Sequence, residues 1–382
     1  MVLGVVLAGG EGLRLRPLIR STPKALVRLA GRPLYAYSLE ELSTVTRSLL
    51  VVAPPGRGAY FTEASRVVEQ ETVGSLDSAI RVAWREAEKL SEDLVLLAFT
   101  GFLSAPKGIS AAVLDFYSSS GYQAVVSVVP VVTGLETYGF VDMKPSGEVK
   151  SYVPPGSSEA PAESGYVFAG VMAASSKAMD ILAREGFNNG LNKLAAEGVL
   201  GAVVWHGDWV EIGYPWDLLE AKRVAMQLVQ PVIDPDAKIG REVSIEGRVA
   251  IARGARVASS SVIVGPAYIG PGASVEPGAY VHSTVVEAGS TVGAHSVVLD
   301  TVALEASTVG PHSYLEASVI GPRALVGAYT LAEAGEPPSP PKRLAGLEKL
   351  LKIKTEIGAV VGEAVKIPPR TTLGPGSVVD KH

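Results

Sequence analysis

Three glycines and two arginines stand close together near the N-terminus, in the segment VVLAGGEGLRLRPL: Gly9, Gly10, Gly12, Arg14 and Arg16. Glycine lets a backbone come close to a ligand, and a guanidinium group binds phosphate oxygens in pairs. The segment therefore predicts a loop that binds a chain of phosphates. It matches neither the P-loop, which needs G-K-[ST], nor the G-x-G-x-x-G fingerprint of dinucleotide-binding folds. A glycine-rich turn with two solvated arginines is the alternative interpretation.

The elements that would position this loop alternate along residues 1–229. Short apolar runs (VLGVVLA, RSLLVVA, DLVLLAF, AVVSVVPVV and GAVVWH) are separated by amphipathic stretches such as LYAYSLEELS, SLDSAIRVAWREAEKL and ISAAVLDFYSSS. This alternation predicts an α/β domain, with a Rossmann-like, mostly parallel sheet and helices on both of its faces. Ligands of such sheets bind at the carboxyl ends of the strands. The glycine segment directly follows the first apolar run, so we expect it at that edge.

From residue 230 onward the apolar residues recur at a different spacing. They fall on every sixth position, with one-residue skips, at Ile239, Ile245, Ile251, Val257, Ile263, Ile269, Val275, Val281, Val286, Val292, Val298, Leu304, Val309, Leu315, Ile320 and Val326. Neither a helix nor a simple strand has this period, whereas each side of a parallel β-helix coil does. We therefore expect a second domain, a β-helix, over 230–382. The proline-rich stretch AEAGEPPSPPKRLAG predicts an inserted loop and short helix at about 332–356, before a last coil.

Composition narrows the class of protein. The chain has 382 residues and a formal net charge of −5, which gives no reason to expect a nucleic-acid surface. No apolar run approaches the roughly 20 residues that cross a bilayer. The apolar N-terminus lacks a basic stretch, so it predicts a buried strand and a cytoplasmic protein. The absence of cysteine excludes disulfides and thiolate metal sites, and the scarcity of asparagine and glutamine favours a thermophilic source.

Three segments together resemble the sugar-1-phosphate nucleotidyltransferase family. LAGGEGLRLRPLIRSTPKALVRLAGRPLYAYSLEEL matches L-A-G-G-x-G-x-R-L-x-P-L…P-K-x-L…G-x-P, VEQETVGS resembles E-Q-x-x-x-G-[TS], and DWVEIGYPWDLLEA resembles W-x-D-I-G-T-P-x-D-L. The resemblance covers nearly the whole chain. It is nearest to archaeal two-domain enzymes that join the transferase to a sugar-phosphate acetyltransferase domain, a left-handed β-helix of hexapeptide repeats. It implies that a sugar-1-phosphate oxygen attacks the α-phosphate of a nucleoside triphosphate and releases pyrophosphate.

The resemblance also implies roles for individual residues. Arg14 and Lys24 would be catalytic, Lys24 by stabilising charge at the α-phosphate; a solvated surface lysine is the alternative. The nucleotide would be held by Leu7, Gly9, Gly10 and Gly12, with its base read by Gln70 and Gly74. The sugar site would be lined by Gly139, Glu163 and Gly165.

The metal side of the motif departs from the family pattern. The family holds Mg²⁺ between two carboxylates, one in a G-D after a central strand and one in W-x-D-I-G. Here the first position is Phe102, which cannot bind a cation, and the second is Glu211. Asp93 lies at the far end of the same run, roughly 30 Å away at about 3.3 Å per residue. The lysine of the family's E-K-P segment is replaced by Val153, and Lys150 is three positions away. We therefore expect a weak or absent Mg²⁺ site.

Three functional hypotheses stay open. The first is a working nucleotidyltransferase whose Mg²⁺ is held by Glu211, phosphates and water. The second is a catalytically silent paralogue that binds nucleotide or sugar nucleotide and regulates, or assembles with, an active relative. The third is acetyl transfer from acetyl-CoA by the β-helix, with His312 as the candidate general base; a coil corner is the alternative role for His312. Because family members commonly form trimers through the β-helix, we expect a homo-oligomer or association with an active paralogue.

Overall fold

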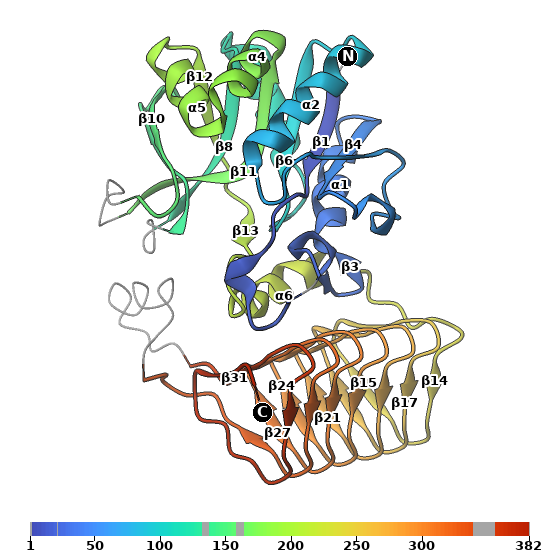
Figure 1. Ribbon diagram of the computed structural model, residues 1–382. Coiled ribbons are helices and arrows are strands. Elements are labelled where there is room, and N and C mark those ends of the chain that lie inside the picture. The colour runs from blue at the N-terminus through green and yellow to red at the C-terminus, as the bar shows by residue number, and fades with distance from the viewer. Residues whose placement is uncertain (1, 21, 132–136, 158–163, 339–355, 382) are drawn as a thin grey trace.

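The computed structural model describes residues 2–20, 22–131, 137–157, 164–338 and 356–381. An α/β domain lies above a β-helix in Figure 1, and helix α6 (Asp217–Leu228) lies between the two. The short helix expected within 332–356 falls mainly on residues outside the described ranges. Among the described helices, none combines the length and the hydropathy that crossing a bilayer requires.

The sheet of the α/β domain is mixed. Its strands follow the order β12–β8–β11–β6–β1–β4–β5, and β9 and β10 extend it beside one end of β11. The bounds are β1 Val2–Leu7, β4 Ser48–Ala53, β5 Val67–Glu69, β6 Leu94–Phe99, β8 Ala124–Val131, β9 Phe140–Met143, β10 Val149–Val153, β11 Gly165–Ser175 and β12 Leu200–Val204. Strand β1 is parallel to β4 and β6, whereas β11 runs antiparallel to β6 and β8. The expected α/β class is confirmed, and β11 adds the antiparallel centre.

Helices cover both faces of this sheet because its strands are apolar on both sides. The helices are α1 Leu34–Ser43, α2 Leu76–Leu90, α3 Ile109–Ser120, α4 Ser176–Glu185 and α5 Phe187–Ala196. Along β1, Val5 and Leu7 pack with α2, α4 and α5, whereas Val6 packs with α1 and α3. This is the alternation of a strand buried on both faces. The amphipathic stretches LYAYSLEELS, SLDSAIRVAWREAEKL and ISAAVLDFYSSS are thus confirmed as helices, and Ser75 caps α2 by accepting a hydrogen bond from the Ser78 N–H.

Short elements lie between the sheet and the β-helix. Strands β7 (Phe102–Ala105) and β13 (Asp208–Glu211) form an antiparallel ribbon, and β2 (Arg28–Leu29) pairs with β3 (Arg32–Pro33). Three 3₁₀ turns complete the region: η1 Leu13–Leu15, η2 Lys24–Leu26 and η3 Gly58–Tyr60. The η1 and η2 turns and the β7–β13 ribbon carry Arg14, Lys24, Phe102 and Glu211.

The second domain is a parallel β-helix with three sheets, one for each side of the coil. The first sheet is β14 Lys238–Ile239, β17 Arg256–Val257, β20 Ser274–Val275, β23 Thr291–Val292, β26 Thr308–Val309, β29 Leu325–Val326 and β32 Lys366–Ile367. The second is β15 Ser244–Glu246, β18 Val262–Val264, β21 Tyr280–His282, β24 Val297–Leu299, β27 Tyr314–Glu316 and β30 Leu331–Ala332. The third is β16 Val249–Ile251, β19 Ala267–Ile269, β22 Val285–Val286, β25 Val302–Ala303, β28 Val319–Ile320, β31 Ala359–Val361 and β33 Ser377–Val379.

The apolar repeat of the sequence forms the interior of this helix, with one correction. Inward aliphatic residues stack from coil to coil, as the pairing of Val292 with Val309 illustrates. On the third side, however, Ala303 is the residue aligned with Val286 and Ile320. Leu304 was the expected inward residue, and it lies instead in the cluster between the domains. These coils have two sides of six residues and one side of five. The five-residue side runs from Val298 to Ala303, one side earlier than the apolar spacing suggested.

The third sheet of the β-helix faces the α/β domain. Its outward residues are Ala250, Tyr268, Val285, Val302, Val319 and Val360. They share one buried apolar cluster with α6 and with Leu15 and Leu18 of the glycine segment. The interface between the domains therefore reaches the segment that the sequence marks for phosphate binding.

Candidate functional site

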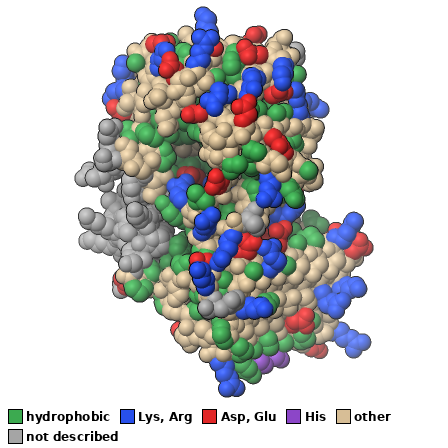
Figure 2. All heavy atoms as spheres, in the orientation of Figure 1, with side chains coloured by type: hydrophobic (Ala, Val, Ile, Leu, Met, Phe, Trp, Pro, Cys, Tyr) green, Lys and Arg blue, Asp and Glu red, His purple; other side chains and the backbone are tan. Residues whose placement is uncertain are grey.

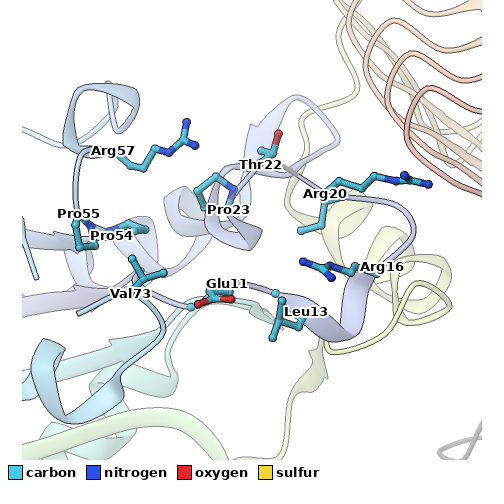
Figure 3. Close-up of a pocket in the computed structure, with 14 residues that line it drawn as sticks. Glu11, Leu13, Arg16, Arg20, Thr22, Pro23, Pro54, Pro55, Arg57 and Val73 are labelled. Carbon is cyan, nitrogen blue, oxygen red and sulfur yellow. The ribbon is translucent and has the colours of Figure 1, made fainter. Parts of the chain in front are cut away.

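A cavity of about 310 Å³ opens beside the glycine segment, at the carboxyl end of β1. Figure 3 shows the residues that line it: Gly9, Gly10, Glu11, Gly12, Leu13, Arg16, Ile19, Arg20, Thr22, Pro23, Pro54, Pro55, Arg57 and Val73. The glycine segment forms one wall, and the loops after β4 and β5 form another. This is the edge at which ligands of α/β sheets bind, so the predicted location of the site agrees with the geometry.

Guanidinium groups give this cavity its charge. Arg16 extends toward the middle of the cavity in Figure 3, and Arg57 faces it from the other side. Arg20 also lines the cavity, but its guanidinium pairs with Asp380, and Glu11 is the one acidic side chain of the lining. Figure 2 shows Lys and Arg side chains, with some Asp and Glu among them, where the two domains meet. The excess of positive over negative side chains in the lining favours an anionic ligand such as a chain of phosphates.

Lys24 lies between two glycines near this cavity. A Cβ built on Gly12 would come within 2.7 Å of the Lys24 Cβ, and one built on Gly101 within 2.2 Å of the Lys24 Nζ. Both glycines have a positive φ, 70° at Gly12 and 100° at Gly101, which other residues rarely adopt. The two glycines thus leave a path for the lysine stem and set its ammonium group against the turn after β6.

Gln70 lies behind the glycine segment. Its side chain is 2% exposed, and its amide Nε2 donates to the carbonyl oxygens of Thr72 and Ser75. Within the described part of the chain, its Oε1 is buried without a hydrogen-bond partner. A Cβ on Gly9 would lie 1.8 Å from that oxygen, and the Gly74 N–H donates to the Gly9 carbonyl at 3.2 Å. An unpaired buried acceptor is costly, but this oxygen lies against Gly9 and Gln70 is outside the cavity lining.

Leu7 and Arg14 lie outside the cavity lining. Leu7 is buried at the end of β1, where its carbonyl accepts hydrogen bonds from the Thr100 N–H and hydroxyl. The Arg14 guanidinium donates to the Thr137 carbonyl at 3.4 Å and pairs with the Glu211 carboxylate at 3.5 Å. It also lies 5.3 Å from the centre of the Tyr214 ring. Of the two arginines in the glycine segment, Arg16 is therefore the one in the cavity.

The residues at the expected metal position do not fit a two-carboxylate Mg²⁺ site. Phe102 stands opposite Glu211 in the β7–β13 ribbon and is 4% exposed. Its ring packs so closely on Gly170 that a Cβ there would lie 2.6 Å from it. The Glu211 carboxylate is engaged by Arg14. In the described part of the chain, no cluster of three or more His, Asp or Glu side chains could hold a metal ion.

The predicted sugar-binding glycines lie together at the end of the sheet near β9 and β10. The Gly139 carbonyl accepts from the Phe168 N–H at 2.8 Å, and its Cα lies against the Tyr152 hydroxyl. Gly165 lies against the Phe140 ring. Burial and, secondarily, the negative charge of Glu211 raise the pKa of the Tyr152 hydroxyl. Glu163 lies outside the described residues.

No lysine takes the place of the family's E-K-P residue. Val153 ends β10, and Lys150 on the same strand pairs with Asp142 at 3.2 Å. Lys150 is half exposed, so its charge is directed to the surface of the β9–β10 hairpin.

His312 lies at an exposed corner of the β-helix. Its φ is 57°, and its ring stacks between those of His295 and Tyr329, with ring centres 5.3 Å and 5.0 Å away. Arg370 continues the stack beyond Tyr329. These residues occupy equivalent corners of successive coils, and each has a left-handed backbone. The alternative interpretation from the sequence, in which His312 is a corner residue of a coil, fits these surroundings.

The cavity contains residues that the sequence motif did not single out. Arg57 follows β4, and Arg20 follows the glycine segment. Neither residue belongs to a recognisable pattern. The signal that would have found Arg57 is its place after an apolar run, since such positions lie at the carboxyl edge of a sheet.

Comparison with known proteins agrees with this geometry. Residues 4–131 match the family of the MobA-like NTP transferase domain. The bifunctional protein GlmU of Methanococcus maripaludis is 26% identical over 266 residues, which are 66% of this chain and 60% of that protein. This chain thus spans about three fifths of the length of that relative.

Two further relatives cover similar parts of the chain. Glucose-1-phosphate thymidylyltransferase of Streptomyces antibioticus is 26% identical over 289 residues, 71% of this chain and 78% of that protein. A bifunctional sugar-1-phosphate nucleotidylyltransferase/acetyltransferase of Sulfurisphaera tokodaii is 24% identical over 277 residues, 68% of this chain and 64% of that protein. Residues 4–131, which include the glycine segment, Lys24, Gln70 and Phe102, therefore match the MobA-like NTP transferase domain, and about two thirds of the chain is similar to proteins named as sugar-1-phosphate nucleotidyltransferases.

Proposed function

We propose that the chain binds a nucleoside triphosphate at the glycine segment and transfers its nucleotidyl group to a sugar-1-phosphate. One observation carries this proposal: the backbone of the glycine segment and the guanidinium groups of Arg16 and Arg57 converge on one cavity. Such donors bind phosphate oxygens. The buried Oε1 of Gln70 lies behind Gly9, so a nucleobase N–H would satisfy it only after a shift of the glycine segment.

In the proposed reaction, a phosphate oxygen of the sugar-1-phosphate attacks the α-phosphorus of the nucleotide. One P–O bond forms there, and the bond from the α-phosphorus to the oxygen bridging to the β-phosphate breaks. Pyrophosphate leaves with the electron pair of that bond. Phosphoryl chemistry of this kind depends mainly on positioning and on neutralising charge. Lys24, held between Gly12 and Gly101, is our candidate for the charge at the α-phosphate.

A second candidate function is favoured by Phe102. With a phenyl ring opposite Glu211, and Arg14 paired with that carboxylate, the chain would bind nucleotide or sugar nucleotide without turnover. It would then act as a regulatory or assembly partner of an active relative. The intact cavity and the altered metal position are both compatible with this reading, so turnover is the quantity that separates the two candidates.

The experiment is a paired measurement of binding and turnover on the full chain. Binding of ATP, GTP, CTP, UTP and dTTP is measured by calorimetry, with and without Mg²⁺. Pyrophosphate release is then followed with glucose 1-phosphate and other sugar-1-phosphates. Turnover of about 1 s⁻¹ or more, typical of enzymes, would support the transferase and exclude the silent paralogue. Binding without turnover would support the second candidate, and a chain that binds none of the five nucleotides would contradict both.

The relative from Sulfurisphaera tokodaii is named as an acetyltransferase as well as a nucleotidylyltransferase. We therefore propose acetyl transfer from acetyl-CoA as an additional activity of the β-helix. His312 is the candidate base for it. The stacking of His312 between His295 and Tyr329 supports a corner role better than a catalytic one. Release of thiol from acetyl-CoA in the presence of an amino-sugar 1-phosphate tests the activity. Activity that survives His312→Ala would remove this base.

We also propose that the chain self-associates through the second sheet of the β-helix. The outward residues of this sheet include an aligned apolar column: Val262, Tyr280, Val297, Tyr314 and Leu331. The corresponding column of the first sheet is mostly polar, with Arg256, Ser274, Thr291 and Thr308 before Leu325, and the third sheet is covered by the α/β domain. Light scattering on wild type, Tyr280→Glu and the control Thr291→Glu tests this. A wild-type monomer at micromolar concentration would contradict it.

A further inference from the structure

The last coil of the β-helix touches the wall of the nucleotide cavity. The Glu363 N–H donates to the Pro17 carbonyl at 2.9 Å, and the Glu363 carboxylate accepts from the Arg20 N–H at 2.6 Å. One residue of the β-helix therefore holds two backbone groups that lie three positions apart on the loop. Gly362 brings the coil this close, since a Cβ on it would lie 2.9 Å from the Pro17 Cβ.

The segment held in this way forms part of the cavity. Arg16, Ile19 and Arg20 line it, and Leu18 is buried in the interdomain cluster. Loop backbone without regular hydrogen bonding takes its position from whatever contacts it makes. Here the contacts come from residue 363, which is separated from the glycine segment by most of the chain. The position of this cavity wall therefore depends on how the β-helix docks.

Glu363 is itself rigidly placed. Its side chain is 7% exposed, and its other carboxylate oxygen pairs with Arg323 of the preceding coil. A buried charge that is engaged on both oxygens has little freedom to move. Asp380, also on the last coil, pairs with the Arg20 guanidinium and accepts through its carbonyl as well. Figure 3 shows Arg20 pointing toward the β-helix.

Other polar contacts between the domains do not reach the cavity. Lys222 of α6 donates to the Ser283 carbonyl at 2.6 Å and pairs with Asp300. Neither Lys222 nor Asp300 lines the nucleotide cavity. The Lys222–Asp300 pair therefore provides a comparison, because it also joins the domains through a carboxylate but lies away from the phosphate-binding wall.

We propose that Glu363 is a positioning residue of the nucleotide site, and that the β-helix sets the affinity for the triphosphate by holding Pro17 and Arg20. This inference rests on the proposed binding of a nucleoside triphosphate. Coupling between two sites is reciprocal, so nucleotide binding also tightens the docking of the last coil. The β-helix is then part of the nucleotide site as well as a separate domain.

The test uses the full chain and whichever of ATP, GTP, CTP, UTP and dTTP binds the wild type most tightly. Glu363→Ala removes the acceptor, Glu363→Gln keeps a neutral one, and Asp300→Asn is the matched interdomain control. Loss of a charge-assisted hydrogen bond that positions the wall should raise the Kd on the order of tenfold in Glu363→Ala. Glu363→Gln should recover part of the loss, and Asp300→Asn should bind like the wild type. Where turnover is measurable, KM for the nucleotide should rise while kcat stays nearly constant.

Hydrogen exchange separates positioning from general destabilisation. In Glu363→Ala the amides of 18–20 should exchange faster, while those of β1 and β6 keep their protection. Should Glu363→Ala misfold, Glu363→Met carries the same comparison, because it removes the acceptor but keeps a side chain of similar length. If the wild type binds nucleotide and both Glu363 variants bind it with the same Kd, the positioning role is overturned, but the proposed function is not. A wild type that binds none of the nucleotides would instead overturn the proposed function, and this inference with it.

Discussion

Phe102 and Glu211 are register partners in the antiparallel ribbon of β7 and β13. Residues directly opposite each other in such a ribbon place their side chains on the same side. In the family that the sequence resembles, these two positions carry the metal-binding carboxylates. The fold thus keeps both positions adjacent, while a buried phenyl ring against Gly170 takes the place of one carboxylate. We therefore expect Mg²⁺-dependent turnover to be sensitive to this pair.

Phe102→Asp should restore a second carboxylate beside Glu211. We expect Mg²⁺-dependent pyrophosphate release to rise at least about tenfold, since two anionic ligands hold a divalent cation much better than one. The loss of a buried ring should cost stability, roughly 3–5 kcal/mol. Phe102→Asn is the control, with nearly the shape of Asp but no charge. An equal gain in both variants, or none in Phe102→Asp while it still folds, would speak against the loss of a metal ligand.

Gly101→Ala should displace Lys24. The added methyl group would lie about where the Lys24 Cε and Nζ now are, at 2.1 Å and 2.2 Å. If Lys24 neutralises charge at the α-phosphate, kcat should fall on the order of a hundredfold, approaching the value of Lys24→Met. Steady-state kinetics on both variants measure this effect. A Gly101→Ala protein with full kcat beside an impaired Lys24→Met would mean that the packing between Gly101 and Lys24 does not set the lysine's role.

Gln70→Leu should weaken nucleotide binding and blur base preference. The substitution keeps a similar volume but removes the buried Oε1 that faces the glycine segment. We expect the Kd for the preferred nucleotide to rise about tenfold, as for one lost hydrogen bond in a buried site, with a smaller change for the others. Gly9→Ala is the companion variant, because its methyl group would push the same amide aside. Calorimetry with the five nucleotides would contradict base reading if the order of affinities stayed the same.

The helices and strands could be predicted from the sequence because local residue patterns determine them. The stretch LYAYSLEELS is helix α1 from its first residue to its last, and the six-residue apolar spacing identified the β-helix. The assignment failed by one residue at Leu304, where Ala303 faces inward instead. The hydrophobic pattern there fits both residues, since Leu304 is also buried, though against the other domain. Periodicity shows that a residue is buried but not which core receives it.

The site was harder to predict because its parts come from distant segments. Arg14 and Arg16 stand two positions apart and have the same chemistry, yet only Arg16 enters the cavity while Arg14 pairs with Glu211. The direction of each side chain follows from the 3₁₀ turn Leu13–Leu15, which contains Arg14 and ends just before Arg16, and no motif specifies this turn. Glu363 contacts Arg20 across 343 positions of sequence, and no local signal marks such a contact. It follows from the docking of two complete domains.

Glu287 should make stability depend on pH. This carboxyl is fully buried between the domains, accepts from the Gly31 N–H at 3.1 Å, and has its pKa raised by burial from 4.5 to about 7. Between these values the folded state binds the extra proton, so the free energy of unfolding should fall as pH rises from about 4.5 to 7, by roughly 3 kcal/mol at most. Glu287→Gln stays neutral and should lose this slope, whereas the half-exposed Glu305→Gln should keep most of it, because burial raises the pKa of Glu287 more than the charge of Glu305 does. Guanidinium unfolding at pH 5 and 8 measures the difference, and parallel slopes for wild type and Glu287→Gln would show that Glu287 titrates alike in both states.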